Sequence, residues 1–207
     1  PTGGFRAVSE AGARDAATAL SQIIGRPLRL QVPWARLIPL PRVAALAGGA
    51  ERVVCALSLK VYGEIRGNLL LVLERGQVAL LLDLLLKDRR ARDASPAPDG
   101  ELTALEESAL LEVGNIVAGA YLNSISRLLG VSLLPSIPGL ALDMAGAVTD
   151  FLLIELAPLS EEALVLASEV REPQSGLRCG IFFLPDPSAR AALEAAPARG
   201  PAEDPAA

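Results

Sequence analysis

The sequence contains no histidine, and aromatic side chains make up only 3% of its 207 residues. Without histidine the chain lacks the commonest general base and the commonest zinc ligand, which excludes Ser-His-Asp triads and classical zinc sites. The net charge of −5 and the lack of a basic stripe with interleaved aromatic residues argue against binding to a nucleic-acid backbone. We therefore expect no metal site and no nucleic-acid partner.

Cysteine is also scarce, because Cys55 and Cys179 each stand alone in an apolar run and form no Cys-x-x-Cys spacing. This pattern favours two buried free thiols over a disulfide or a redox pair, and it fits a reducing compartment. No apolar run is long enough to cross a bilayer, and the nearly uncharged run 137–148 is interrupted by Asp143. We expect a cytoplasmic protein with no secretory signal and no membrane insertion.

Aliphatic residues are abundant, and a hydrophobic fraction of 51% is enough to build a large core. Residues 88–100 are charged and then rich in proline, serine and alanine, which is typical of an exposed connector. The tail 196–207 has the same character and is predicted to be flexible. We expect one domain over 1–207 that consists of two halves, 1–87 and 101–195.

The two halves repeat one pattern at a fixed offset. Val8 to Pro33 aligns without gaps on Val113 to Pro138, 105 residues further on, and Gly25 then meets Gly130. Other matched pairs are Ala13 with Ala118, Leu20 with Ile125, Ser21 with Ser126 and Leu28 with Leu133. The order of helix, glycine, strand and proline is the same in both, which indicates an internal duplication.

Each half is predicted to contain a long helix, a strand, a short helix after the proline, further strands and a closing helix. In the first half these segments are 3–25, 28–39, 41–48, 51–62, 65–74 and 75–87. In the second half they are helix 102–129, strand 131–137, helix 138–148, strands 150–158, 162–171 and 178–184, and helix 186–195, with an ambiguous strand count. The predicted fold class is a layered α+β (α/β) fold, in which two pseudo-symmetric halves share one β-sheet with the two long helices on one face.

The helix 102–129 carries an unusual polar strip. Ser108, Glu112 and Asn115 follow one another at spacings of four and three, so at about 100° per residue they fall within roughly 60° on one face. A capping box, "TALE" at 103–106, and Gly130 after the last turn predict the two ends of this helix. Such a strip is usually an ordinary solvated surface, but it also suits contact with a partner.

The strip also carries a resemblance to a known family. The pattern S-x3-E-x2-N at Ser108, Glu112 and Asn115, followed by 22 residues and Pro138, resembles the signature of the CheC/CheX/FliY family of bacterial chemotaxis phosphatases, and within it the CheC type. The stretch "DAATALSQ", 15–22, is similar to the first-half helix of that type, and the duplication covers nearly the whole chain.

The resemblance implies a hydrolase that removes the aspartyl phosphate from the response regulator CheY. Asn115 would orient the attacking water, Glu112 would dock on a lysine of the regulator, and Ser108 would contact the partner. An acyl phosphate has a good leaving group, so an oriented water is needed more than a strong base. Pro138 would shape the corner between a strand and the next helix. The protein would need no cofactor of its own, because Mg²⁺ is expected on CheY.

The first half departs from the motif. The same offset places Gly3, Ala7 and Glu10 at the serine, glutamate and asparagine positions, while Pro33 is retained. A shifted register that uses Glu10 as the glutamate puts Ala13 at the asparagine position and loses the proline. Both registers lack the carboxamide, so we expect one working site and a degenerate first one.

Several alternatives remain open at this point. Gly114 and Gly119 suit tight helix packing, but Gly119 also extends the strip and would allow close approach of a partner. Asp143 is either a local cap facing solvent or a contact for the receptor deamidase CheD, which proteins of this type bind through the helix after the proline. The alternative function is a non-catalytic adaptor for CheD or phosphorylated CheY. We expect a monomer, because one chain carries both repeats.

Overall fold

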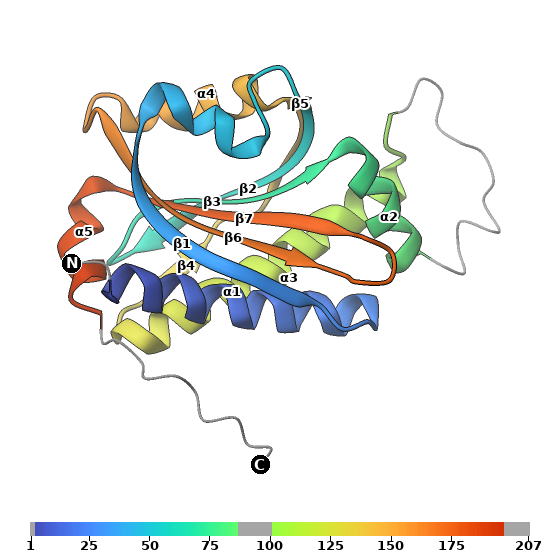
Figure 1. Ribbon diagram of the computed structural model, residues 1–207, viewed down its shortest axis with the longest axis horizontal. Coiled ribbons are helices and arrows are strands. Elements are labelled where there is room, and N and C mark those ends of the chain that lie inside the picture. The colour runs from blue at the N-terminus through green and yellow to red at the C-terminus, as the bar shows by residue number, and fades with distance from the viewer. Residues whose placement is uncertain (1–2, 87–100, 197–207) are drawn as a thin grey trace, which may run out of the picture.

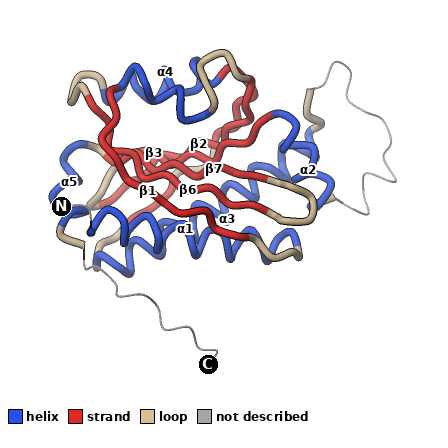
Figure 2. Tube along the Cα trace, in the orientation of Figure 1, coloured by secondary structure: helices blue, strands red, loops and turns tan. Residues whose placement is uncertain are grey.

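The computed structural model describes residues 3–86 and 101–196, in which one antiparallel seven-stranded sheet lies between two layers of helices (Figure 1, Figure 2). The first half contributes α1 (Gly3–Ile24), β1 (Arg29–Pro39), the 3₁₀ helix η1 (Leu40–Ala47), β2 (Val53–Gly63), β3 (Gly67–Glu74) and α2 (Arg75–Leu85). The second half contributes α3 (Ala104–Leu129), β4 (Leu133–Pro135), β5 (Gly139–Met144), α4 (Ala145–Leu156), β6 (Glu162–Arg171), β7 (Arg178–Pro185), η3 (Pro187–Ala189) and α5 (Arg190–Glu194). The predicted α+β class is confirmed.

Most of the predicted elements are confirmed, and two are wrong. All six segments of the first half agree with the structure to within two residues, as do the long helix and the last two strands of the second half. The predicted helix 138–148 is instead strand β5 followed by the start of α4, and the predicted strand 150–158 lies mainly in α4. The predicted connector 88–100 lies outside the described residues. So does the predicted tail, apart from Ala196, which is buried against the core.

The two errors have one physical cause. Short apolar runs such as "GLALDM" and "DFLLIEL" fit a strand or a buried helix equally well by periodicity. In the folded chain, six residues from Gly139 to Met144 pair with β2, which supplies backbone hydrogen-bond partners that the local sequence does not reveal. The helix can start only where this pairing ends, at Ala145.

The sheet has an internal twofold pattern. Its order is β1-β6-β7-β3-β2-β4, with β5 also paired to β2, and all pairs are antiparallel. The last strands of the two halves, β3 and β7, pair in the centre. On either side, β1 of the first half pairs with β6 of the second, and β4 and β5 of the second half both pair with β2 of the first. The halves therefore share one sheet, as predicted.

The repeat register is also visible in the backbone. Gly25 and Gly130, which follow the two long helices, have φ values of 66° and 69° in the left-handed region that favours glycine. The main-chain bond from Arg26 N–H to Ser21 O is 3.2 Å long, and its counterpart 105 residues further on has the same length. The ungapped offset of the sequence is thus the offset of the structure.

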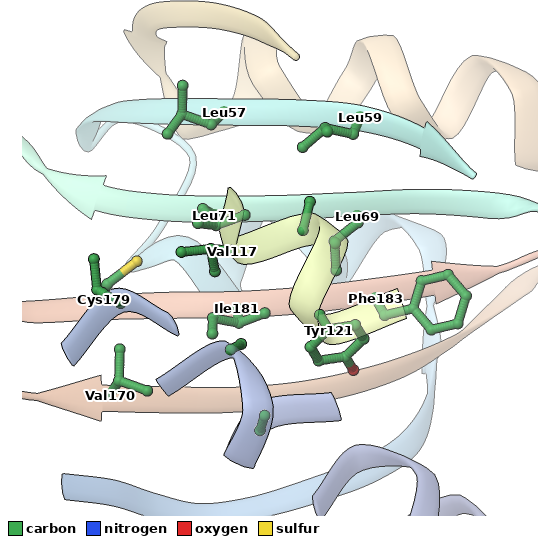
Figure 3. Packing of buried hydrophobic residues seen from close by; sticks show 14 of the residues in the cluster. Leu57, Leu59, Leu69, Leu71, Val117, Tyr121, Val170, Cys179, Ile181 and Phe183 are labelled. Atoms are coloured by element: carbon green, nitrogen blue, oxygen red, sulfur yellow. The ribbon is translucent and has the colours of Figure 1, made fainter. Parts of the chain in front are cut away.

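The larger core lies between the sheet and the two long helices, which pack side by side on one face (Figure 1). Val117 and Tyr121 of α3 point at Leu69, Leu71 and other apolar side chains of the sheet (Figure 3). A smaller core lies on the opposite face, beneath α4 and η1. With its inner face buried in this way, α3 presents its polar strip on the outside of the molecule.

Candidate functional site

Helix α3 carries the polar strip, and its ends are fixed as the sequence predicts. Thr103 Oγ1 accepts a hydrogen bond from the Glu106 backbone N–H at 3.3 Å, and Glu106 Oε2 accepts one from Thr103 N–H at 3.0 Å. At the other end Gly130 terminates the helix. The capping box is confirmed, and it determines where the first turn starts and so where each later side chain projects.

The strip faces away from the sheet. Ser108, Glu112 and Asn115 are exposed, whereas Val117 and Tyr121 on the other side of the helix are fully buried. Within the described residues, none of the three strip side chains makes a hydrogen bond or an ion pair. The carboxylate and the carboxamide are therefore available to bind a partner.

Asn115 lies on the side of α3 that faces away from α1. Ser124 Oγ donates to the Ala11 backbone oxygen of α1 at 2.9 Å, and Asn115 precedes Ser124 by nine residues, a rotation of about 180°. Helix α1 covers β1 and β6, whereas α3 packs on β2, β4 and β5. The carboxamide therefore projects on the side of the sheet edge formed by β4 and β5.

Pro138 lies in a bulge of this edge. Strand β2 pairs Val61 with Pro135 and Ser58 with Gly139, so three residues of the edge lie opposite only two of β2. One extra residue at this point is a β-bulge, and proline fits it because it has no N–H to leave unpaired. The expected corner between strand and helix is wrong, since another strand follows.

The corresponding part of the first half has a similar irregularity. The pairing of β1 with β6 shifts register between Gln31 and Trp34, the interval that contains Pro33. Both motif prolines therefore coincide with an interruption of strand pairing.

The two interior glycines of α3 have different surroundings. A Cβ atom at Gly114 would lie 3.3 Å from Leu57 Cδ1 of β2, so this glycine allows the helix to approach the sheet closely. A Cβ atom at Gly119 would meet no heavy atom within 4 Å. Packing thus accounts for Gly114, whereas the surface beside Gly119 is open.

The first repeat has no comparable strip. On α1, Gly3 is exposed, while Ala7 and Glu10 are partly buried. Glu10 Oε1 accepts a hydrogen bond from Arg6 Nε at 2.7 Å, so its charge is paired within the helix. No carboxamide occupies the position equivalent to Asn115.

Asp143 is exposed near the end of β5, and its Oδ1 accepts a hydrogen bond from the Met144 backbone N–H at 2.7 Å. This contact is local and does not cap α4, because the N-cap residue of that helix is Met144 and no side chain caps it. Asp150 and Ile154 are exposed on α4, where the sequence pattern predicted a strand, and neither is part of the candidate site.

Ile137 lies in the bulge and is not among the residues that the sequence predicted for the site. It is 89% exposed, the largest value among the exposed large hydrophobic residues of the described chain. The sequence feature that could have drawn attention to Ile137 is its position immediately before the motif proline. In the same described residues, no cluster of three or more potential metal ligands occurs, and no helix is long and apolar enough to cross a membrane.

This duplicated α+β architecture also occurs in solved structures. FliY of Thermotoga maritima matches with a TM-score of 0.65 and 22% identity, covering 92% of each chain. A CheX-CheY-BeF3-Mg²⁺ complex from Borrelia burgdorferi matches with a TM-score of 0.56 and 13% identity, covering 86% of this chain and 96% of that one. At these identities the likeness defines the class of fold.

Sequence comparison defines the family. A model described as the CheC-like family matches residues 105–140, the segment that contains the Ser-Glu-Asn strip and Pro138. The protein "CheY-P phosphatase CheC" of Bacillus subtilis (strain 168) is 31% identical over 189 residues, which is 88% of this chain and 86% of the relative. The chain belongs to the CheC-like family.

Proposed function

We propose that this protein is a phosphatase that hydrolyses the aspartyl phosphate of the chemotaxis response regulator CheY. The observation that carries the proposal is the strip Ser108, Glu112 and Asn115, which is exposed and without partners within the described residues. Membership of the CheC-like family supports it, since the Bacillus subtilis relative is named a CheY-P phosphatase.

Asn115 is proposed to orient the attacking water. Water attacks phosphorus, the bond from phosphorus to the aspartyl oxygen breaks, and inorganic phosphate leaves the regenerated carboxylate. Because that carboxylate is a good leaving group, alignment of the water in line with the bond is the main requirement. A carboxamide suits this task, since it can both donate and accept hydrogen bonds without carrying charge.

Glu112 is proposed to dock on a lysine of the regulator. It lies one turn before Asn115 on the same face, so a charge-assisted hydrogen bond from it would fix the position of the carboxamide. Ser108 adds a contact one turn earlier. In this mechanism Mg²⁺ belongs to the regulator, and this chain supplies no metal ligand.

Only the second repeat is proposed to be active. The first repeat has an alanine at the glutamate position and lacks the carboxamide, and its Glu10 is held by Arg6. A carboxylate at the asparagine position would also repel an anionic phosphoryl group. We further propose a monomer in the cytoplasm, where phosphorylated CheY would be its substrate.

The test measures the loss of acyl phosphate from phosphorylated CheY, with Mg²⁺ present. Wild type should accelerate the loss, and Asn115→Ala should reduce the rate by about a hundredfold, as when one positioned transition-state group is removed. Glu112→Ala should also lower the rate, by weakening docking. Glu10→Ala serves as the control in the first repeat and should behave like wild type.

The same assay separates the enzyme from the alternative. Binding of CheY loaded with Mg²⁺ and beryllofluoride should survive Asn115→Ala, because the carboxamide acts mainly in the transition state. If wild type binds this CheY but leaves the lifetime of its phosphate unchanged, the phosphatase proposal fails. An adaptor for phosphorylated CheY or for CheD then takes its place.

A further inference from the structure

Ile137 is the most exposed large hydrophobic side chain of the described residues, at 89%. It lies between β4 and β5, in the bulge that also contains Pro138. An isolated surface isoleucine is ordinary. This one lies beside the candidate site.

The backbone that carries Ile137 is held firmly. The preceding residue, Ser136, donates its backbone N–H to Lys60 O at 2.8 Å, and its Oγ accepts the Lys60 N–H at 3.0 Å. The same hydroxyl donates to the Ile137 carbonyl oxygen at 2.8 Å. Three hydrogen bonds thus fix the backbone at the bulge, so that binding a partner there costs little backbone entropy.

The bulge is next to the turn of α3 that bears Asn115. Gly114 lies over Leu57 of β2, which pairs with Leu140 of β5, just beyond the bulge. Asn115 follows Gly114 and projects on the side of this edge, away from α1. The bulge that carries Ile137 therefore lies on the side of α3 towards which Asn115 projects.

A regulator bound at Asn115 needs more surface than the strip provides. A stable protein interface buries about 800 Å² on each partner and involves roughly 20 to 30 residues of each. The strip is one side chain wide and, from Ser108 to Gly119, about 16 Å long at the helical rise of 1.5 Å per residue. An interface that is centred on Asn115 and wider than the strip reaches the β4–β5 edge.

We propose that Ile137 is a docking residue for the phosphorylated response regulator, which covers it when the phosphoryl group lies at Asn115. This inference rests on the proposed function, because it assigns the same partner to a neighbouring surface. Ile137 binds the regulator in its ground state and takes no part in the chemistry. Its removal should raise KM and leave kcat unchanged.

The experiment compares Ile137→Ser with Ile154→Ser. Ile154 is 70% exposed on α4, on the other side of the sheet, so this variant also removes an exposed isoleucine but outside the proposed interface. Affinity for CheY loaded with Mg²⁺ and beryllofluoride is measured by titration, and KM and kcat are measured with phosphorylated CheY. We expect Ile137→Ser to weaken binding and raise KM about tenfold, Ile137→Val to lose little, and Ile154→Ser to match wild type.

Binding and turnover distinguish the two proposals. If Ile137→Ser binds CheY as wild type does, the inference is overturned and the phosphatase proposal stands. Equal losses of affinity for CheY in Ile137→Ser and Ile154→Ser also overturn the inference, because the effect is then not specific to the β4–β5 edge. If wild type binds without turnover, a selective loss in Ile137→Ser still supports the docking surface, although the enzyme proposal fails. If wild type does not bind CheY at all, both proposals fail.

Discussion

Replacing Gly119 with alanine is expected to stabilise the protein. Glycine inside a helix costs about 1 kcal/mol relative to alanine, and a Cβ atom at Gly119 meets no heavy atom within 4 Å. We therefore expect the free energy of unfolding to rise by about 0.5 to 1 kcal/mol. For a chain of this size that corresponds to an increase in Tm of about 1 °C to 4 °C.

Gly114→Ala provides the matched comparison in the same helix. Its Cβ would lie 3.3 Å from Leu57 Cδ1, so part or all of the helical gain is offset by crowding. Thermal unfolding followed by circular dichroism compares the two variants with wild type. A lower Tm for Gly119→Ala, or an equal rise for both variants, would refute the reasoning from open space and packing.

A larger side chain at position 119 tests docking without disturbing the fold. Leucine is a good helix former, and a Cβ atom at Gly119 would meet no heavy atom within 4 Å, so we expect Gly119→Leu to fold. If CheY approaches the helix closely at this point, the leucine should weaken binding of CheY carrying beryllofluoride by tenfold or more while the Tm stays at or above the wild-type value. Wild-type affinity in this variant would mean that the partner does not approach Gly119.

Three further predictions concern the core and the ionisable groups. Gly12→Ala should destabilise the protein by about 1 to 3 kcal/mol, because its Cβ would lie 2.8 Å from ring atoms of the buried Tyr121; chemical denaturation measures this. Hydrogen bonds within its hairpin, first of all from the Ser175 side chain, lower the pKa of Glu172 from 4.5 to about 2. The stabilisation from its ionised form is therefore present above pH 4.5 and lost as the pH falls towards 2, so the deficit in Tm of Glu172→Gln should shrink over that range. Burial raises the pKa of the two cysteine thiols to about 11 and about 12, and labelling by a thiol reagent at pH 8 should be slow until denaturant is added.

Each of these three predictions would be contradicted by a specific result. An unchanged free energy of unfolding in Gly12→Ala would mean that the ring of Tyr121 moves aside without penalty. A deficit in Glu172→Gln that stays constant from pH 7 to pH 2 would remove the ionised carboxylate as the source of the stabilisation. Rapid labelling of the native protein would show that the thiols become accessible without unfolding.

Several features of the candidate site are determined by residues close together in the sequence. The capping box and the terminal glycine fix the ends of α3, and the spacing of Ser108, Glu112 and Asn115 fixes their common face. All of these follow from the helical period and could be predicted. Whether the segment after Pro138 is a strand or a helix could not be predicted from its own hydrophobic period. The repeat does predict a strand: shifted by 105 residues, the end of β1 at Pro39 falls on Met144, the end of β5.

Sequence alone determined the duplication, the two long helices and the polar strip, because periodicity, capping and spacing are properties of neighbouring residues. Tertiary structure decided that residues 139–144 pair with β2 and that Asn115 projects towards the β4–β5 edge. It also decided that Ile137 stays exposed in a bulge while Tyr121 is fully buried. Those outcomes depend on contacts between residues far apart in the chain, and hydrophobic burial, which is non-directional, does not specify them from local sequence.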